Sequence, residues 1–306
     1  MRTPAPDVNL LVERILKQQG RDLAKLTSEV LANFANPPSE SPAAKDQAWA
    51  AQTKHPELSQ GAYTAAAQSV AILLQSIEEY RHGILALLST DQMLALPTMN
   101  CVRAIHDAAL TICSLADPHI SSQERLARSA ADFLAGIQGG IPVLLTLSDT
   151  FGDSPEDLRR VQTSREDAIA LFQSIGLFVK VNAETGQAQN VRCEDKVANV
   201  DVKTTDLSLK YTPDIAFSWR LNSGATHSSR WLSNGLDGPW PLLLVSMIFP
   251  LLDISDALTT NLLGYVGLPT AGIQKDTHMR RRLLLNRTGA KWPYSDHVEY
   301  SRSGGR

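Results

Sequence analysis

The chain has 306 residues, of which 43% are hydrophobic and 20% are charged, and its formal net charge is −3 with a pI near 6.2. This length allows one large domain or two modest ones, and the composition is that of an ordinary globular protein. The slight acidity excludes a global positive field that would draw the chain to nucleic acid or an anionic membrane, so any such contact requires a local basic patch.

The first predicted helix covers residues 7–36, in which apolar side chains recur at steps of three and four. Three prolines within residues 37–42 end this helix, because proline cannot continue it and biases the preceding residue towards an extended conformation. The stretch 37–58 is polar and contains proline, so we predict a loop or linker with room for a short helix around Trp49.

Two long helices are predicted over residues 59–89 and 91–115, because the apolar side chains of each segment lie on one face. A further helix begins at residue 121 or 122, where a serine caps its first turn. The segment 139–142 (GGIP) is expected to kink or stop that helix.

The pattern changes after another predicted helix over residues 155–175. Short runs of alternating apolar and polar residues within 177–210 indicate a small β-hairpin or an irregular insert. The helical signal then returns in segments near 214–234, 240–266 and 275–286.

Together these elements predict a mainly α protein, a helical bundle with a small β-hairpin or irregular insert near residues 177–210. We divide the chain into an N-terminal helix and Pro-containing linker (1–58), a helical bundle domain (59–292) and a flexible tail (293–306).

The three cysteines, Cys101, Cys113 and Cys193, are too scattered for a disulfide framework or a zinc site. We interpret them as reduced thiols, which predicts a cytoplasmic protein. The most apolar run, residues 239–252, is shorter than the ~20 residues that span a bilayer, so we expect a buried core helix and no membrane contact. The motifs indicate neither a cofactor nor a metal.

The candidate catalytic residues are Arg220 and His227, which six residues separate. In a helix a step of seven is nearly two turns, so both side chains fall on one face, about 10 Å apart along the axis. A histidine near its neutral pKa can move a proton during attack by an RNA 2′-hydroxyl, and an arginine can hold the phosphate through two hydrogen bonds. Such a reaction needs no metal.

This spacing resembles the Arg-x(4–6)-His motif of the HEPN superfamily, helical bundles that include metal-independent ribonucleases of toxin and defence systems. The resemblance covers residues 218–228 (SWRLNSGATHS) and a general helical character. It implies an RNA-acting homodimer in which Arg220 and His227 of both subunits form a composite site, with Asn222 as the polar residue inside the motif. The chain departs from the family at Leu221, where a polar residue usually follows the arginine, and at Gly224, which weakens a helix.

A structural interpretation competes with this one. Arg220 can pair with a carboxylate, for which Asp214 and Asp237 are near in sequence, and His227 can cap its helix. Because some HEPN proteins are not catalytic, the sequence leaves open whether this chain is an enzyme.

Arg103 and His106 are candidate substrate-binding residues, because a step of three places them on one helix face. Glu78 and Glu79 lie on the preceding helix, which should run antiparallel, so charged groups of the two helices can meet. Such a layer is either a set of structural ion pairs or part of an enzyme site inside the bundle.

Asp253 and Asp256 lie three residues apart beside the apolar run. Two carboxylates on one helix face suit Mg²⁺, and helix capping is the structural alternative.

Arg280 and Arg281 belong to the basic stretch 275–291, which suits an RNA backbone or forms a solvated face. We take these two arginines as further candidate substrate-binding residues.

The sequence thus supports three hypotheses: a HEPN-like, metal-independent ribonuclease, a non-catalytic helical protein that binds other proteins, and a small-molecule enzyme with its site inside the bundle. The first predicts a basic cleft that holds Arg220 and His227, and the second predicts that they form separate structural pairs. The third predicts a deep, partly apolar cavity on which polar groups converge.

Overall fold

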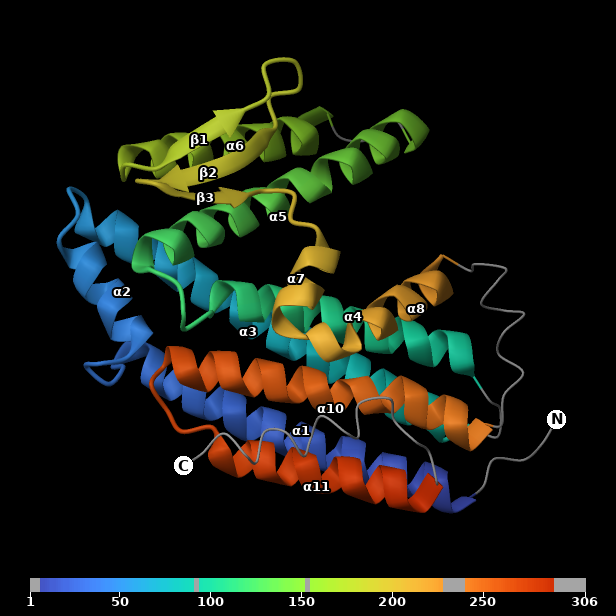
Figure 1. Ribbon diagram of the computed structural model, residues 1–306. Helices are drawn as coiled ribbons and strands as arrows, with labels where there is room; N and C mark the ends of the chain where they lie inside the picture. The colour runs from blue at the N-terminus through green and yellow to red at the C-terminus, as the bar shows by residue number, and fades with distance from the viewer. Residues whose placement is uncertain (1–5, 91–93, 152–154, 228–239, 289–306) are drawn as a thin grey trace.

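The computed structural model describes residues 6–90, 94–151, 155–227 and 240–288, and these residues are mostly helical (Figure 1). Its elements are α1 (Pro6–Ala35), α2 (Pro42–Ala51), α3 (Pro56–Leu88), α4 (Ala95–Leu115), α5 (Ser122–Phe151), α6 (Pro155–Ser174), β1 (Phe178–Val181), β2 (Ala188–Cys193), β3 (Lys196–Asn199), α7 (Thr204–Tyr211), the 3₁₀ turn η1 (Pro213–Ile215), α8 (Ala216–Thr226), α10 (Trp240–Tyr265) and α11 (Ala271–Thr288). The prediction of a mainly α protein with a small β insert is confirmed.

Helices α1, α3, α4 and α10 form the main bundle, in which one apolar cluster is shared by all four. Figure 1 shows α10 lying alongside α1 and α11, with α4 on its other side. Leu16, Ile84, Ile112 and Leu252, one from each helix of the bundle, are fully buried in this cluster. The sequence of α10 is apolar on nearly every face, which is the pattern of a helix surrounded by others.

Helices α5 and α6 pack with the sheet around a second apolar cluster. The three strands are antiparallel in the order β1-β2-β3. Val179 pairs with Val191, which pairs with Ala198, and these three side chains are buried on the inner face. The alternation of apolar and polar residues from which the insert was predicted reflects this alternation of buried and exposed positions along the strands.

Two local expectations can be compared with the structure, and of the kink or stop expected at 139–142 the stop is wrong. Helix α5 does not stop at the 139–142 segment but continues to Phe151, with Pro142 inside it. Proline removes one backbone hydrogen bond yet holds φ at a helical value, so the chain can continue through it. The short helix expected around Trp49 within the stretch 37–58 is present as the ten-residue helix α2, whose cap Ser41 accepts a hydrogen bond from the Ala44 amide at 3.1 Å.

The boundaries proposed at residues 58 and 292 stay predictions. Helix α1 contributes Val12 and Leu16 to the same cluster as α3 and α4. The predicted tail, residues 293–306, lies outside the described residues.

The segment Leu243–Tyr265 of α10 is long and apolar enough to cross a bilayer, with a mean hydropathy of 1.5. Its most apolar stretch is 65% buried inside the protein, and the core helix of a soluble protein has the same properties. The absence of membrane contact therefore stays a prediction.

A buried ion pair joins the two clusters. Asp46 of α2 and Arg125 of α5 are 1% and 3% exposed, and two guanidinium nitrogens of Arg125 donate to the two carboxylate oxygens at 2.7 and 2.9 Å. Tyr265 at the end of α10 donates to the same carboxylate at 3.0 Å. Arg125 also donates to the carbonyls of Asp117 and Ile120, at 2.6 and 2.9 Å, in the turn between α4 and α5.

We predict that Arg125→Met lowers the free energy of unfolding by about 3–5 kcal/mol, because it leaves the Asp46 carboxylate buried without its partner. Urea denaturation followed by circular dichroism measures the change. Arg160→Met removes an ion pair on the surface of α6, where the arginine is 76% exposed, and should change stability by less than about 1 kcal/mol. Equal effects of the two substitutions would contradict a structural role for the buried pair.

Candidate functional site

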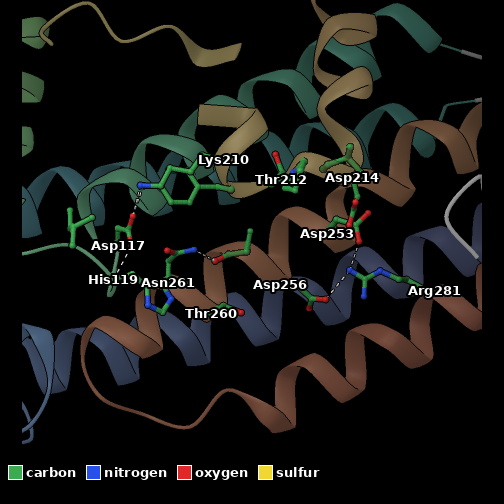
Figure 2. Close-up of a pocket in the computed structure, with 15 residues that line it drawn as sticks. Asp117, His119, Lys210, Thr212, Asp214, Asp253, Asp256, Thr260, Asn261 and Arg281 are labelled. Carbon is green, nitrogen blue, oxygen red and sulfur yellow. Dashed lines mark hydrogen bonds and ion pairs between the residues drawn. The ribbon is translucent and has the colours of Figure 1, made fainter. Parts of the chain in front are cut away.

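A cavity of about 570 Å³ lies between α7 and η1 on one side and α10 on the other (Figure 2). The turn between α4 and α5 forms one end, and α11 reaches the other end with Arg281. The lining residues are Asp117, His119, Ile120, Lys210, Tyr211, Thr212, Pro213, Asp214, Ile215, Asp253, Asp256, Ala257, Thr260, Asn261 and Arg281. This volume falls within the range of about 300–1,000 Å³ that is typical of small-molecule sites.

The long wall of the cavity is one face of α10. Asp253, Asp256, Ala257 and Thr260 follow one another at steps of three, one and three, so a regular helix presents them on one side. From Met247 to Leu252 α10 is apolar and buried in the bundle, and Asp253, its first charged residue, lies where the helix reaches the cavity. The sequence of one helix therefore supplies both a core segment and a binding surface.

Asp117 fixes the end of the cavity formed by the α4–α5 turn. Its carboxylate accepts hydrogen bonds from Lys210 Nζ and Tyr211 Oη, both at 2.8 Å, and from the backbone amide of His119 at 2.9 Å. Burial opposes ionisation of Asp117, but the hydrogen bonds from Lys210, the His119 amide and Tyr211 outweigh it and hold its pKa below the usual value. This carboxylate therefore stays charged and anchors α7 to the turn.

Arg281 holds two carboxylates at the opposite end. One nitrogen, Nη2, contacts Asp253 Oδ1 and lies 2.8 Å from Asp256 Oδ2. The side chains of both aspartates are 24% exposed, and that of Arg281 is 17% exposed. Within the described residues, Oδ1 of Asp256 and Nε of Arg281 are buried without a hydrogen-bond partner.

The two carboxyl groups on α10 hold protons more tightly than an exposed aspartate does. Burial raises the pKa of Asp253 to about 6, the positive charge of Arg281 opposes the shift, and the negative charges of Asp256 and Asp214 add to it. Burial also raises the pKa of Asp256, against the opposing charge of Arg281. Asp253 is thereby suited to exchange a proton near neutral pH.

The sequence singled out Asp253, Asp256 and Arg281. The two aspartates were considered as Mg²⁺ ligands or helix caps, and the arginine as a substrate-binding residue. Asp253 and Asp256 do share a helix face, but the structure pairs them with Arg281. Arg280 points elsewhere and forms an ion pair with Asp22 of α1 at 2.5 Å. Two cations of the predicted basic stretch are therefore neutralised by carboxylates of the bundle.

Arg103 and His106 lie on α4 behind the cavity wall. Arg103 donates to Asp107 at 2.8 Å and stacks 4.0 Å above the centre of the Trp219 ring. His106 is fully buried, with Nε2 2.9 Å from Oγ1 of Thr212, which lines the cavity. Burial and then the charge of Arg103 lower the pKa of His106 to about 4, so the ring is neutral at pH 7.

Glu78 and Glu79 are not brought to this cavity. Glu78 contacts Arg81 on its own helix, and Glu79 accepts a hydrogen bond from Gln75 at 2.9 Å. Both glutamates line a separate groove between α1 and α3.

Arg220, Asn222 and His227 belong to α8 and its C-cap, apart from the residues that line the cavity. Arg220 and His227 are exposed, whereas Asn222 is 3% exposed. The expectation that this segment is helical holds as far as Thr226, and His227 is the C-cap. The role of the three residues in catalysis stays a prediction.

Sequence reasoning missed Asp117, Lys210, Tyr211, Thr260 and Asn261. Asp117 contacts Lys210 and Tyr211, and Lys210 is 93 residues from Asp117 in the chain. No local sequence pattern indicates a contact between residues so far apart. A local signal existed for Thr260 and Asn261, which follow Asp253 and Asp256 in the polar second half of α10, because polar residues in a mainly apolar helix indicate a boundary with solvent or a site.

In the described parts of the chain, no three His, Cys, Asp or Glu side chains are grouped so that they could hold a metal ion. All three cysteines are free.

Comparison with known proteins gives no match: no family model fits the chain, and no curated protein or solved structure is significantly similar to it. The resemblance to HEPN proteins and the cytoplasmic location therefore stay predictions.

The raised pKa of Asp253 predicts a pH-dependent stability difference between the wild type and Asp253→Asn. The folded protein binds the Asp253 proton more tightly than the unfolded chain, so the contribution of this group falls as pH rises from about 4 to about 6. Asparagine cannot titrate. Between pH 4 and pH 7 the wild type should therefore lose about 1–3 kcal/mol relative to the variant.

Urea denaturation at several pH values measures this difference. The control is Asp167→Asn, which removes an exposed carboxyl group from α6 and so reports the effect of losing a charge away from the cavity. A gap between wild type and Asp253→Asn that is constant over pH would contradict the shifted pKa.

Proposed function

We propose that this protein binds a small polar molecule in the cavity between α7, α10 and α11. The observation that carries the proposal is the cavity itself, in which charged and hydroxyl groups from four separate parts of the chain surround about 570 Å³. Apolar surface from the half-buried Ile120 and Ala257 lies among these groups. A mixed lining of this size is typical of small-molecule sites.

The walls of the cavity are held in place before any ligand arrives. Asp117 fixes α7 through Lys210 and Tyr211, and Arg128 donates to Tyr211 Oη at 2.8 Å from α5. Arg281 fixes α11 against α10. Because a preorganised site loses little conformational entropy on binding, this rigidity favours a specific ligand.

The chemistry of Asp253 supports an enzymatic version of this function. A carboxyl group with a pKa near 6 can act as a general acid or a general base at neutral pH. Asp253 lines the cavity, within reach of a bound molecule. A small-molecule enzyme with its site inside the bundle is therefore the form of the proposal that we favour.

The test is to fill the cavity. Ala257 lines it from α10, and Ala257→Phe would occupy part of its volume. Ala32→Phe adds the same ring at an exposed position of α1 and serves as the control. We expect that polar fragments which bind the wild type in a ligand-observed NMR screen also bind Ala32→Phe but bind Ala257→Phe at least tenfold more weakly. Fragments that bind all three proteins equally, or no binding fragment at all, would contradict the proposal.

A second candidate function is metal-independent RNA cleavage by Arg220 and His227. The observation that favours it is that both side chains are exposed and lie seven residues apart in sequence, Arg220 on α8 and His227 at its C-cap. A second copy of the chain could then complete a composite site, as the resemblance to HEPN ribonucleases implies. This surface is separate from the residues that line the cavity.

We expect RNA cleavage in EDTA to fall at least a hundredfold in His227→Ala and in Arg220→Ala if this second proposal is correct, because general acid–base catalysis contributes about 10²–10⁴-fold. His82→Ala, which removes an exposed histidine from α3, is the control. Cleavage of a mixed pool of structured and single-stranded RNAs measures the rates. Equal rates in all variants, or no cleavage by the wild type, would remove the ribonuclease proposal.

A further inference from the structure

We propose that helix α11 is a gate of the cavity. It detaches from α1 and α10 while the rest of the bundle stays folded, and it carries Arg281 away from one end of the cavity wall. The closed arrangement, in which Arg281 holds α11 against α10, remains the major state. The gating role rests on the proposed ligand-binding function, whereas the detachment of α11 is a property of the fold and can be measured without a ligand.

Polar side chains form much of the face with which α11 packs on the bundle. Among the described side chains of α11 three are buried, Thr277, Arg280 and Leu284, and of these Leu284 alone is apolar. The apolar residues Met279 and Leu283 lie on the outer side of the helix and are 54% and 48% exposed. Because burial of apolar surface is the main favourable term in folding, this distribution predicts that α11 is docked weakly.

Ion pairs supply part of the remaining attachment. Arg280 pairs with Asp22 of α1 at 2.5 Å, and Arg281 bridges Asp253 and Asp256 of α10. A buried ion pair adds little net stability, because both charges lose their hydration when the helix docks and recover it when the helix leaves. Detachment of α11 therefore costs less free energy than separation of an apolar interface of the same size.

The interface beneath α11 is also incompletely packed. A small cavity of about 30 Å³ lies between α11 and the helices α1 and α10, with Gln19, Ser255 and Thr277 in its lining. Within the described residues, Oδ1 of Asp256 and Nε of Arg281 are buried without a hydrogen-bond partner. Water reaches these two atoms when α11 moves away, so the open state gains hydrogen bonds that the closed state lacks.

The connection between α10 and α11 locates the hinge. Gly267 has a φ of +76°, and a Cβ atom there would lie 2.8 Å from the Cβ atom of Ser41, so this turn is packed against the N-cap of α2. Residues 268–270 follow without regular structure and lead directly into α11. Rotation about these three residues would move α11 and leave the end of α10 in place. Figure 1 shows α11 on the outside of the bundle, where it packs on α1 and α10.

Hydrogen exchange of the full-length wild-type protein tests the detachment, with mass spectrometry as the readout and urea below the unfolding transition. An isolated helix of this length is marginal in water, so the amides of α11 exchange once it detaches. We expect residues 275–286 to exchange roughly a hundredfold faster than residues 247–252 in the buried part of α10. Their exchange should also depend less on urea than global unfolding does, because detachment exposes less surface. Equal protection of the two segments would overturn the proposal.

Two adjacent arginines of α11 provide matched variants. Arg281→Met leaves two carboxylates of α10 without their partner in the closed state, so it should speed exchange of residues 275–286 roughly tenfold and leave residues 247–252 within about twofold. Arg282→Met removes an exposed charge from the same helix and should change exchange by less than about twofold. Equal effects of the two variants would contradict the proposed attachment. The wild-type comparison needs no variant, so it decides the question even if Arg281→Met does not fold.

The gating role has a separate test. The probe is a fragment from the NMR screen that binds the wild type and is excluded by Ala257→Phe. Because it binds the closed cavity, it should slow exchange of residues 275–286 by about threefold or more at saturation and leave the sheet residues 188–199 unchanged. If α11 exchanges early but the bound fragment does not slow it, the gate proposal falls and the cavity function stands. If α11 exchanges early and no fragment binds, the cavity function falls and the detachment of α11 stands.

Discussion

The buried ion pair between Asp46 and Arg125 is the contact on which the arrangement of this protein depends. It joins α2 to α5 where both side chains are almost without solvent, and Tyr265 ties the end of α10 to the same carboxylate. Desolvating two charges is expensive, so the pair persists only because Arg125 is also satisfied by two carbonyls of the α4–α5 turn. That turn contains Asp117, whose side chain anchors α7 through Lys210. The position of α7, one wall of the cavity, thus depends on the Asp46–Arg125 ion pair, which lies outside the cavity.

The cavity forms where α10 passes from the apolar core of the bundle to the polar surroundings of η1 and α11. Its first half satisfies the bundle with apolar side chains such as Leu244, Ile248 and Leu252, all fully buried. Beyond Leu252 the same helix must face η1 and α11, and carboxylates alternate with core residues there. Arg281 reduces the cost of burying Asp253 and Asp256 but cannot neutralise both. Burial therefore raises the pKa of each carboxyl group despite the opposing charge of Arg281, which links the packing of the helix to the chemistry of the site.

Local patterns were sufficient for the elements of the fold and insufficient for its site. The apolar period of the helices and the alternation in the 177–210 insert are properties of short segments, so the long helices and a small β insert could be predicted, although residues Thr204–Tyr211 form helix α7. The passage of α5 through Pro142 depends on how much the surrounding helix gains, which the proline itself does not reveal. Asp253 and Asp256 could be placed on one face from their spacing. Their partner Arg281 is 28 residues from Asp253, and no periodicity relates the two.

The folded structure changes the interpretation of Arg280 and Arg281. In the sequence they belong to a basic stretch that suits a phosphate backbone, whereas in the folded chain they neutralise carboxylates of α1 and α10. Among the described residues of α11, Lys275 and Arg282 are the exposed cations that remain for an RNA surface. The same ion pairs leave the cavity with a negative excess, because one guanidinium is shared between two aspartates. Using the arginines for packing therefore weakens the case for a polyanion at this end of the bundle.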